Sequence, residues 1–282
     1  MRLKLNLIGR PVVPADRLQA NIDRCRSLNL PTVKDRRGTR TGPLHIVGGG
    51  PSSRRWLGNY RGITDYREPV KTQFATLPPV EGDVWAINGT CPWLRSEGIE
   101  AVFFSCDALP EVAEFARGAR WAVVAEQCDP SVFDVLLEGG ADIITFDCAH
   151  GEIVGTGSTT ATATPMTGAI LGFRQFIFYG CEGSYERGRT HADRHEPRAE
   201  ELVVELGGEE FLTAPDFLKQ CEELSAMFHM ERRESPGTRV FQELSGGLLR
   251  QMIEHGHDYA IRWLSPTMRA NIEQTMKELA AA

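Results

Sequence analysis

Six short runs of hydrophobic residues, each about as long as one β-strand, recur between residues 44 and 180. Helix-length segments separate them, and several runs end at glycine, asparagine or aspartate. Runs that are hydrophobic throughout are typical of strands buried on both faces, and their alternation with helices indicates parallel βα units. The pattern therefore predicts an α/β fold with a doubly wound, mostly parallel sheet. The predicted strands are residues 44–50, 83–89, 100–108, 120–127, 142–149 and 175–180.

The segments on either side of these runs have different patterns. Before them, residues 16–28 have helical spacing, and a polar, turn-rich stretch follows. After them come a hairpin centred on Gly207 and Gly208, an amphipathic helix over 215–234, one more strand and further helices. The chain is thus divided into an N-terminal accessory arm, a Rossmann-like nucleotide-binding domain and a small α+β C-terminal extension. These parts are expected at residues 1–42, 43–200 and 201–282.

Composition narrows the class of protein. The chain has 282 residues, of which 41% are hydrophobic and 24% charged, values that are ordinary for a globular protein. Its net charge of −7 does not indicate nucleic-acid binding. No hydrophobic run is long enough to span a membrane, and the first residues lack the hydrophobic stretch of a secretory signal. The seven cysteines lack zinc-site or disulfide-framework spacing. We expect a cytoplasmic protein with reduced thiols, in which oligomers are possible.

The first predicted strand ends in a glycine turn, and a helix follows. Because the N-terminus of a helix presents free backbone N–H groups, this arrangement predicts a phosphate-binding turn. The alternative is a tight turn without a ligand. The turn is not a complete GxGxxG, so a dinucleotide-dependent oxidoreductase is less favoured. The turn consists of Gly48, Gly49, Gly50, Pro51 and Ser52.

Polar residues also end or follow other predicted strands. Asn88 can hydrogen-bond a base or ribose, and Asp107 can hold a ribose hydroxyl or a magnesium ion. At the start of the small-residue helix of about 160–172, Ser158, Thr159 and Thr160 can bind an anion. For Asn88, Asp107, Ser158, Thr159 and Thr160, capping a helix is the alternative role. Gly157 and Thr159 are also candidate nucleotide-binding residues.

The loop after the sixth strand contains the best candidates for proton transfer. His191 lies among small and polar residues, and its ordinary pKa suits general acid or base catalysis. It can instead simply order the loop, and His195 competes for the same role. Neighbouring arginines can neutralise phosphates, or they can form a solvated charge cluster with nearby glutamates. These residues are Arg187, Arg189, Arg194, Glu182, Glu186 and Glu196.

Several short motifs in this order resemble the MptE-like and motility-associated-factor family. That family in turn resembles bacterial sialyltransferases that use CMP-sialic acid. The resemblance covers about residues 44–195, and a later segment also matches. One departure is Glu182, since the family usually has Asp two residues after the glycine of this loop. The motifs are GGGPS (48–52), AIN (86–88), CD (106–107), GSTTATA (157–163), LGF (171–173), YGCEGSY (179–185), GRTHA (188–192) and VFQELSGG (240–247).

The resemblance implies that the glycine turn, Asn88 and the Gly157–Ser158 segment bind a nucleotide and that His191 is the catalytic acid or base. Arg189 would stabilise the leaving phosphate. We expect a glycosyltransferase that moves a nonulosonic or sialic acid-like sugar from a CMP donor to an unknown hydroxyl-bearing acceptor. One alternative is an MptE-like diphosphokinase that uses ATP and magnesium, with Asp107 as metal ligand, on a hydroxymethylpterin-like alcohol. Another is a non-catalytic nucleotide-binding or scaffold protein.

Overall fold

A seven-stranded, fully parallel sheet forms the centre of the molecule. The computed structural model describes residues 13–60, 82–148, 159–185, 191, 201–234 and 239–263. The strand order is β5-β4-β3-β2-β1-β6-β9, and every neighbouring pair is parallel. This confirms the predicted α/β fold. The strands are β1 (Pro43–Val47), β2 (Asp83–Ile87), β3 (Val102–Ser105), β4 (Trp121–Ala125), β5 (Asp142–Phe146), β6 (Gln175–Tyr179) and β9 (Val240–Glu243).

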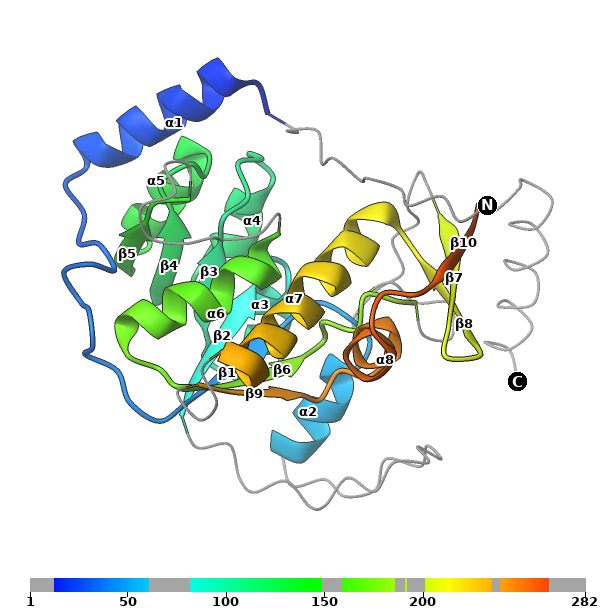
Figure 1. Ribbon diagram of the computed structural model, residues 1–282. Coiled ribbons are helices and arrows are strands. Elements are labelled where there is room, and N and C mark those ends of the chain that lie inside the picture. Colours follow the sequence, from blue (N-terminus) through cyan, green and yellow to red (C-terminus); the bar gives the residue numbers. More distant parts are fainter. Residues whose placement is uncertain are drawn as a thin grey trace.

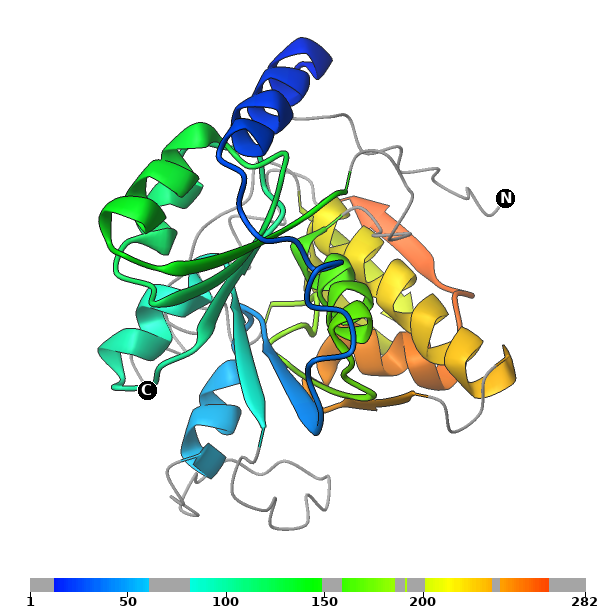
Figure 2. The same ribbon diagram turned by 90° about the vertical axis from the view of Figure 1, so that its left-hand side faces the viewer.

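Helices cover both faces of this sheet, as Figure 2 shows from the side. From β1 the chain proceeds strand by strand to β5 at one edge, and then returns to place β6 on the other side of β1. The order therefore reverses at β1, and such a switch point is where open α/β sheets bind ligands. One face carries α2 (Ser53–Tyr60), α3 (Thr90–Ser96), α4 (Val112–Ala116) and α5 (Pro130–Glu138); the other carries α6 (Thr160–Leu171) and α7 (Pro215–Glu234).

Aromatic side chains fill much of the core. Phe104 stacks on Trp85 and on Phe146, with 5.2 Å between ring centroids in both pairs. Phe173, which follows α6, meets the Trp85 ring edge-on at 5.9 Å. Such pairs add to the free energy gained by burying the rings. The strand segments are hydrophobic throughout because helices cover both faces of the sheet.

The helix α6 is nearly enclosed, and its small residues make this possible. The Thr164 and Thr167 hydroxyls donate to the carbonyls of Thr160 and Ala163, at 2.8 and 2.9 Å, so these buried groups are satisfied within the helix. At Gly168 the helix approaches β1 so closely that an added Cβ would lie 2.7 Å from Leu44 Cδ2.

We expect Gly168→Ala to destabilise the protein by about 1 kcal/mol. Overpacking a core costs roughly 1–3 kcal/mol, which exceeds the gain of up to about 1 kcal/mol from alanine's higher helix propensity. Urea unfolding measures the change. Ala20→Gly on the exposed side of α1 (Ala15–Ser27) isolates the propensity contribution. A more stable Gly168→Ala protein would show that α6 does not need this close approach.

The C-terminal segment contributes both a small sheet and an edge strand of the large one (Figure 1). The predicted hairpin is present, and Gly207 and Gly208 both have the positive φ angles of a tight hairpin turn, 62° and 81°. The small sheet also contains a third antiparallel strand, Ala260–Trp263, which the sequence pattern does not indicate. In the large sheet, β9 pairs with β6. These elements are β7 (Leu202–Leu206), β8 (Glu209–Thr213), β10 (Ala260–Trp263) and α8 (Gly247–His255).

The N-terminal segment lies against the β5 side of the sheet. Helix α1 packs beside α5 (Figure 1), where Asn21 Nδ2 donates to the Gln127 carbonyl at 3.1 Å. Thr32 then forms a parallel bridge with Thr145 and so pairs with part of the β5 edge. An edge strand covered in this way is protected from pairing with other chains.

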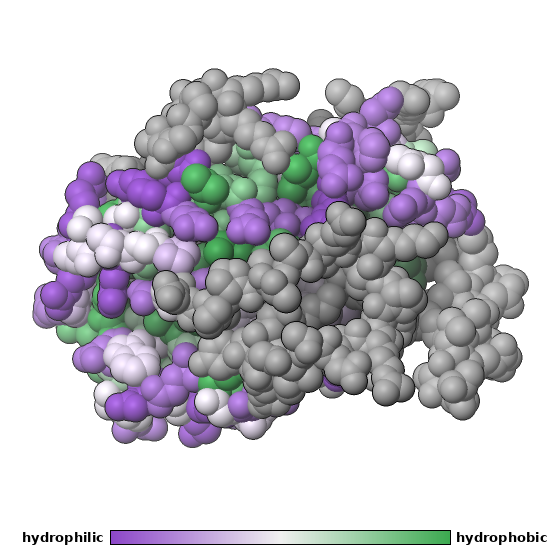
Figure 3. All heavy atoms as spheres, turned by 90° about the horizontal axis from the view of Figure 1, so that it is seen from below, coloured by the Kyte–Doolittle hydropathy of each residue, from purple (hydrophilic) through white to green (hydrophobic). Residues whose placement is uncertain are grey.

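Hydrophilic residues form most of the coloured surface in Figure 3, and hydrophobic residues show there as small separate areas. Among the residues that the structure describes, the exposed large hydrophobic side chains come one each from β4, α5, α7 and β9: Trp121, Leu137, Met230 and Val240. Within the described ranges, no helix combines the length and hydrophobicity needed to span a membrane. The last helix that the sequence pattern predicts at the end of the chain falls on residues outside those ranges.

Candidate functional site

The glycine turn after β1 binds a carboxylate of the protein itself. Glu182 Oε1 accepts a hydrogen bond from the Ser52 backbone N–H at 2.7 Å, and its Oε2 accepts one from Ser52 Oγ at 2.7 Å. Both residues are buried. The carboxylate lies at the N-terminus of α2, where the helix dipole favours a negative charge. The anion at this end of the turn is therefore Glu182.

Other backbone N–H groups of the turn donate hydrogen bonds to carbonyls of the protein itself. Gly48 N–H donates to the Tyr179 carbonyl at 2.7 Å, and Gly50 N–H donates to the Gly180 carbonyl at 2.9 Å. A Cβ on Gly50 would overlap the Glu182 carboxylate, so glycine is required there. Gly48, Gly50 and Ser52 thus join the ends of β1 and β6. Pro51 has no backbone N–H and cannot donate a hydrogen bond. Gly49 lies close to Thr90 and His191.

The segment that carries Glu182 is held from several sides. Cys181 N–H donates to Ser245 Oγ at 3.0 Å, and the Glu182 carbonyl accepts from Leu249 N–H at 3.0 Å. Thr213 Oγ1 donates to the next carbonyl, that of Gly183. The idea that Glu182 belongs to a solvated charge cluster is therefore wrong. The other loop candidates lie outside the described residues, namely Arg187, Arg189, Arg194, His195, Glu186 and Glu196.

Two buried oxygen atoms at the end of β2 have no protein partner within the described part of the chain. They are Asn88 Oδ1 and Thr90 Oγ1. Asn88 has a left-handed backbone, with φ 45°, and its N–H donates to the Phe104 carbonyl at 3.1 Å. Buried polar atoms are normally hydrogen-bonded, so two unsatisfied ones call for an explanation such as a ligand or water.

His191 lies close to Gly49, as does Thr90. A Cβ built on Gly49 would be 3.1 Å from His191 Cδ2 and 3.5 Å from Thr90 Oγ1. On its other side, the His191 ring meets Phe217 of α7, with 6.5 Å between centroids and a steep angle of 69°. Tyr185 also meets Phe217 edge-on, at 6.4 Å. The imidazole therefore lies between the glycine turn and the first turn of α7.

The N-terminus of α6 approaches the same helix α7. Thr159 is the N-cap of α6, and its side chain and that of Thr162 accept hydrogen bonds from each other's backbone N–H groups. Thr159 Oγ1 also contacts Gln220 Oε1 at 3.5 Å. The capping role anticipated as the alternative for Thr159 is thus present, while Gly157 and Ser158 lie outside the described residues.

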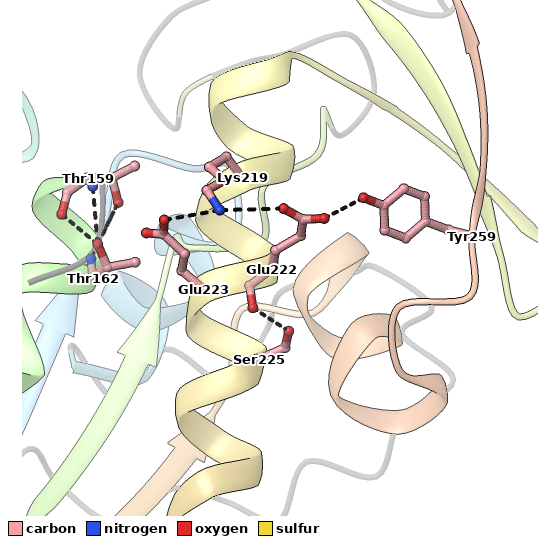
Figure 4. Close-up of polar contacts among 7 residues, drawn as sticks. All are labelled: Thr159, Thr162, Lys219, Glu222, Glu223, Ser225 and Tyr259. Carbon is pink, nitrogen blue, oxygen red and sulfur yellow. Dashed lines mark hydrogen bonds and ion pairs between the residues drawn. The ribbon is translucent and has the colours of Figure 1, made fainter. Parts of the chain in front are cut away.

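Helix α7 separates two groups of polar side chains (Figure 4). Glu223 lies on the side of Thr159 and Thr162, whereas Glu222 lies on the opposite side and accepts a hydrogen bond from the Tyr259 hydroxyl. Lys219 forms ion pairs with both glutamates, 3.4 Å to Glu223 and 3.9 Å to Glu222. The face of α7 that is directed toward α6 is therefore polar around Lys219 and Glu223.

Asp107 folds back onto its own loop. Its Oδ1 accepts a hydrogen bond from Leu109 N–H at 3.1 Å, in a turn that precedes α4. Burial raises the pKa of this carboxyl group, although the Leu109 hydrogen bond opposes the shift. Among the described residues, no group of three or more His, Cys, Asp or Glu side chains is arranged to hold a metal ion. Magnesium binding by Asp107 remains a prediction.

Of the predicted site residues, the structure brings Gly49 and His191 together at the end of β1, and Asn88 follows the neighbouring strand β2. Thr90 and Phe217 belong to the same place but were not anticipated. Thr90 lies one residue beyond the AIN–Gly segment, and Phe217 has the spacing of an ordinary hydrophobic helix face. In the sequence, Glu182 stands out as a departure from a family pattern and as a member of a possible charge cluster, and its partner Ser52 is far away in the sequence.

The comparisons with known proteins concern the fold. No known family description matches this sequence, and no curated protein matches it. Among solved structures, the chain is similar to the MAf glycosyltransferase from Magnetospirillum magneticum AMB-1, with a TM-score of 0.52 and 16% sequence identity. The similarity covers 93% of this chain but 42% of that one, so the chain spans less than half the length of its structural neighbour. The two proteins share the α/β architecture that the hydrophobic pattern of this chain predicts.

Proposed function

We propose that this protein is a transferase that moves a sugar from a CMP-type sugar nucleotide to a hydroxyl group. The observation that carries the proposal is the pair of unsatisfied buried oxygens after β2, Asn88 Oδ1 and Thr90 Oγ1, of which Thr90 Oγ1 lies close to Gly49, as does His191. The fold similarity to a glycosyltransferase supports the reaction class.

The two oxygens specify what the ligand must offer. Asn88 Oδ1 can only accept hydrogen bonds, whereas a threonine hydroxyl can donate or accept. A ribose hydroxyl or an exocyclic amino group satisfies the asparagine, and a nucleotide carries both kinds of group. Because Glu182 places a negative charge at Gly50 and Ser52, we place the phosphate nearer Gly49 and the N-terminus of α6.

His191 is the proposed proton acceptor. When the sugar–phosphate bond breaks, the attacking hydroxyl of the acceptor must lose its proton, and a positioned imidazole can take it. Phe217 holds the ring from the side of α7. The phosphate gains negative charge as it leaves, and Arg189, together with backbone N–H groups, would stabilise that charge.

We expect Thr90→Val to reduce nucleotide binding without destabilising the free protein. Valine has nearly the same shape, and the hydroxyl that it removes has no described partner to lose. Asn88→Gly removes the other oxygen while tolerating the left-handed backbone. Thermal shift with CMP, CDP, UDP, ATP and NAD measures binding, because a ligand stabilises by RT ln(1 + [L]/Kd). Loss of the CMP shift in both variants, at unchanged stability for Thr90→Val, supports the proposal.

The same panel separates the competing functions. A shift with ATP and magnesium alone favours the diphosphokinase, and a shift with NAD alone favours an oxidoreductase. If no nucleotide stabilises the protein, the result favours a non-catalytic scaffold protein over a transferase. Mass spectrometry of nucleotide that co-purifies with the protein then identifies the donor class directly.

A further inference from the structure

The backbone N–H groups around the glycine turn are almost all bonded to the protein itself. Beyond those already described, Ser53 N–H donates to the Gly50 carbonyl at 3.1 Å, and Arg54 N–H donates to the Pro51 carbonyl at 3.3 Å. Within the described part of the chain, the only N–H of this turn without an acceptor is that of Gly49. The turn therefore keeps one backbone donor for a ligand, whereas a phosphate-binding turn ordinarily offers several to one phosphate.

The start of α2 is also closed to solvent. Ser52 and Ser53 are 1% and 0% exposed, and Glu182 beside them is 3% exposed. The Ser53 hydroxyl donates to the Gly48 carbonyl at 2.6 Å, which ties the first turn of the helix back to the strand end. The Glu182 carboxylate thus fills the place in which a phosphate could accept hydrogen bonds from this helix N-terminus, and it puts a negative charge there.

We propose that Glu182 is a specificity-determining residue that restricts the donor to a sugar nucleotide with a single phosphate group. The inference rests on the proposed function, because it concerns the donor that the same site accepts. A sugar joined to a nucleoside monophosphate has one ionised phosphate, and Gly49 N–H is the donor left for it. A nucleoside diphosphate sugar brings a second ionised phosphate, which meets a buried carboxylate instead of free N–H groups. We expect UDP- and GDP-linked sugars to be rejected for this reason, whatever their base.

Charge repulsion sets the size of the effect. At an effective dielectric constant of about 20, two unit charges several ångströms apart change an affinity by roughly tenfold or more. Glutamine has nearly the same size as glutamate and no charge. Glu182→Gln therefore removes the repulsion and keeps the side chain in place, so that it isolates the contribution of the charge.

Binding of CMP and CDP tests the proposal, because the two ligands share base and ribose and differ by one phosphate. Calorimetric titration of the folded protein measures both affinities. We expect the unaltered protein to bind CDP at least about tenfold more weakly than CMP, and this ratio to shrink by roughly tenfold in Glu182→Gln. Equal affinities in the unaltered protein, or an unchanged ratio in Glu182→Gln, would overturn the proposal. If neither ligand binds, the proposed function itself is wrong and the donor class falls with it.

Asp129→Asn is the matched control for the loss of one negative charge. Asp129 accepts hydrogen bonds from the N–H and the hydroxyl of Ser131 at the start of α5, at 3.1 and 2.7 Å. This is the same kind of contact at another helix, and it follows β4 rather than β1. The ratio of CMP to CDP affinity should stay unchanged in Asp129→Asn. An equal change in both variants would assign the preference to net charge and contradict a specific role of Glu182.

Formate tests, without any nucleotide, whether an anion belongs at the place of the Glu182 carboxylate. Glu182→Ala leaves the N–H and the hydroxyl of Ser52 without their acceptor. Formate offers the missing carboxylate, so it should raise the melting temperature of Glu182→Ala with increasing concentration. The unaltered protein should show no such rise, and sodium chloride at equal ionic strength controls for screening. A variant that responds no more to formate than to chloride would contradict the occupied anion site on which the proposal depends.

Discussion

Replacing Glu182 with alanine is expected to lower the free energy of unfolding by about 3 kcal/mol or more. The carboxylate accepts hydrogen bonds from both the N–H and the hydroxyl of Ser52, and a hydrogen bond to a charged group contributes roughly 1.5–3 kcal/mol. Its loss leaves two buried donors unsatisfied at the N-terminus of α2. For a protein of this size the melting temperature should fall by roughly 5–10 °C, which calorimetry and urea unfolding measure.

A double-mutant cycle with Ser52→Ala assigns the effect to this contact. Ser52 Oγ also accepts a hydrogen bond from Gly180 N–H at 3.0 Å, so the single Ser52 variant has costs of its own. The coupling energy between the two substitutions should exceed about 1 kcal/mol, since directly bonded residues are not additive. Glu209→Ala, at an exposed position, should change stability little. Additive effects of Ser52→Ala and Glu182→Ala would disprove the contact as the source of the stability.

The second large effect is expected at His191. His191→Ala should reduce turnover of a CMP-type sugar nucleotide by about a hundred- to ten-thousand-fold, the usual contribution of a positioned general base. Nucleotide affinity should change little, because Asn88 and Thr90 provide the proposed ligand contacts. Release of CMP in the presence of a hydroxyl-bearing acceptor measures turnover, and the thermal shift with CMP measures binding.

Two comparisons make the His191 result specific. His255→Ala removes an exposed imidazole at the end of α8 and should leave turnover unchanged. Phe217→Leu should lower turnover less than His191→Ala, since it loosens the ring without removing it. Full turnover by His191→Ala with a sugar nucleotide, together with strict magnesium dependence with ATP, would favour the diphosphokinase instead.

Most of the large sheet could be predicted from the sequence because burial on both faces leaves a clear signal. The six hydrophobic runs match β1 to β6, and the helix expected over about 160–172 is α6, Thr160–Leu171. The third strand of the small sheet, Ala260–Trp263, has no such signal. It is short, and its Ala260 and Arg262 are exposed, so its pairing depends on β7 from far back in the chain.

The candidate site was harder to predict because its contacts join distant segments. Strand ends pointed to Asn88 and the glycine turn, since parallel strands end at one edge of the sheet, and their binding of a nucleotide stays a prediction. The Ser52–Glu182 contact could not be predicted, because a glutamate in a polar loop looks the same whether it is solvated or buried. Thr90 gave no signal either, as an unsatisfied hydroxyl is recognised only when the surrounding atoms are known.

The anchoring of the Glu182 segment also sets an order of events during synthesis on the ribosome. Its backbone carbonyl accepts a hydrogen bond from Leu249, and its neighbour Gly183 accepts one from Thr213. At roughly 5–20 residues per second, several seconds pass between the emergence of Glu182 and that of Leu249. Until then the N-terminus of α2 lacks a fixed carboxylate and β6 lacks its neighbour β9. The nascent chain therefore exposes an unpaired strand edge in this interval, when a chaperone that shields hydrophobic strands would have its largest effect on yield.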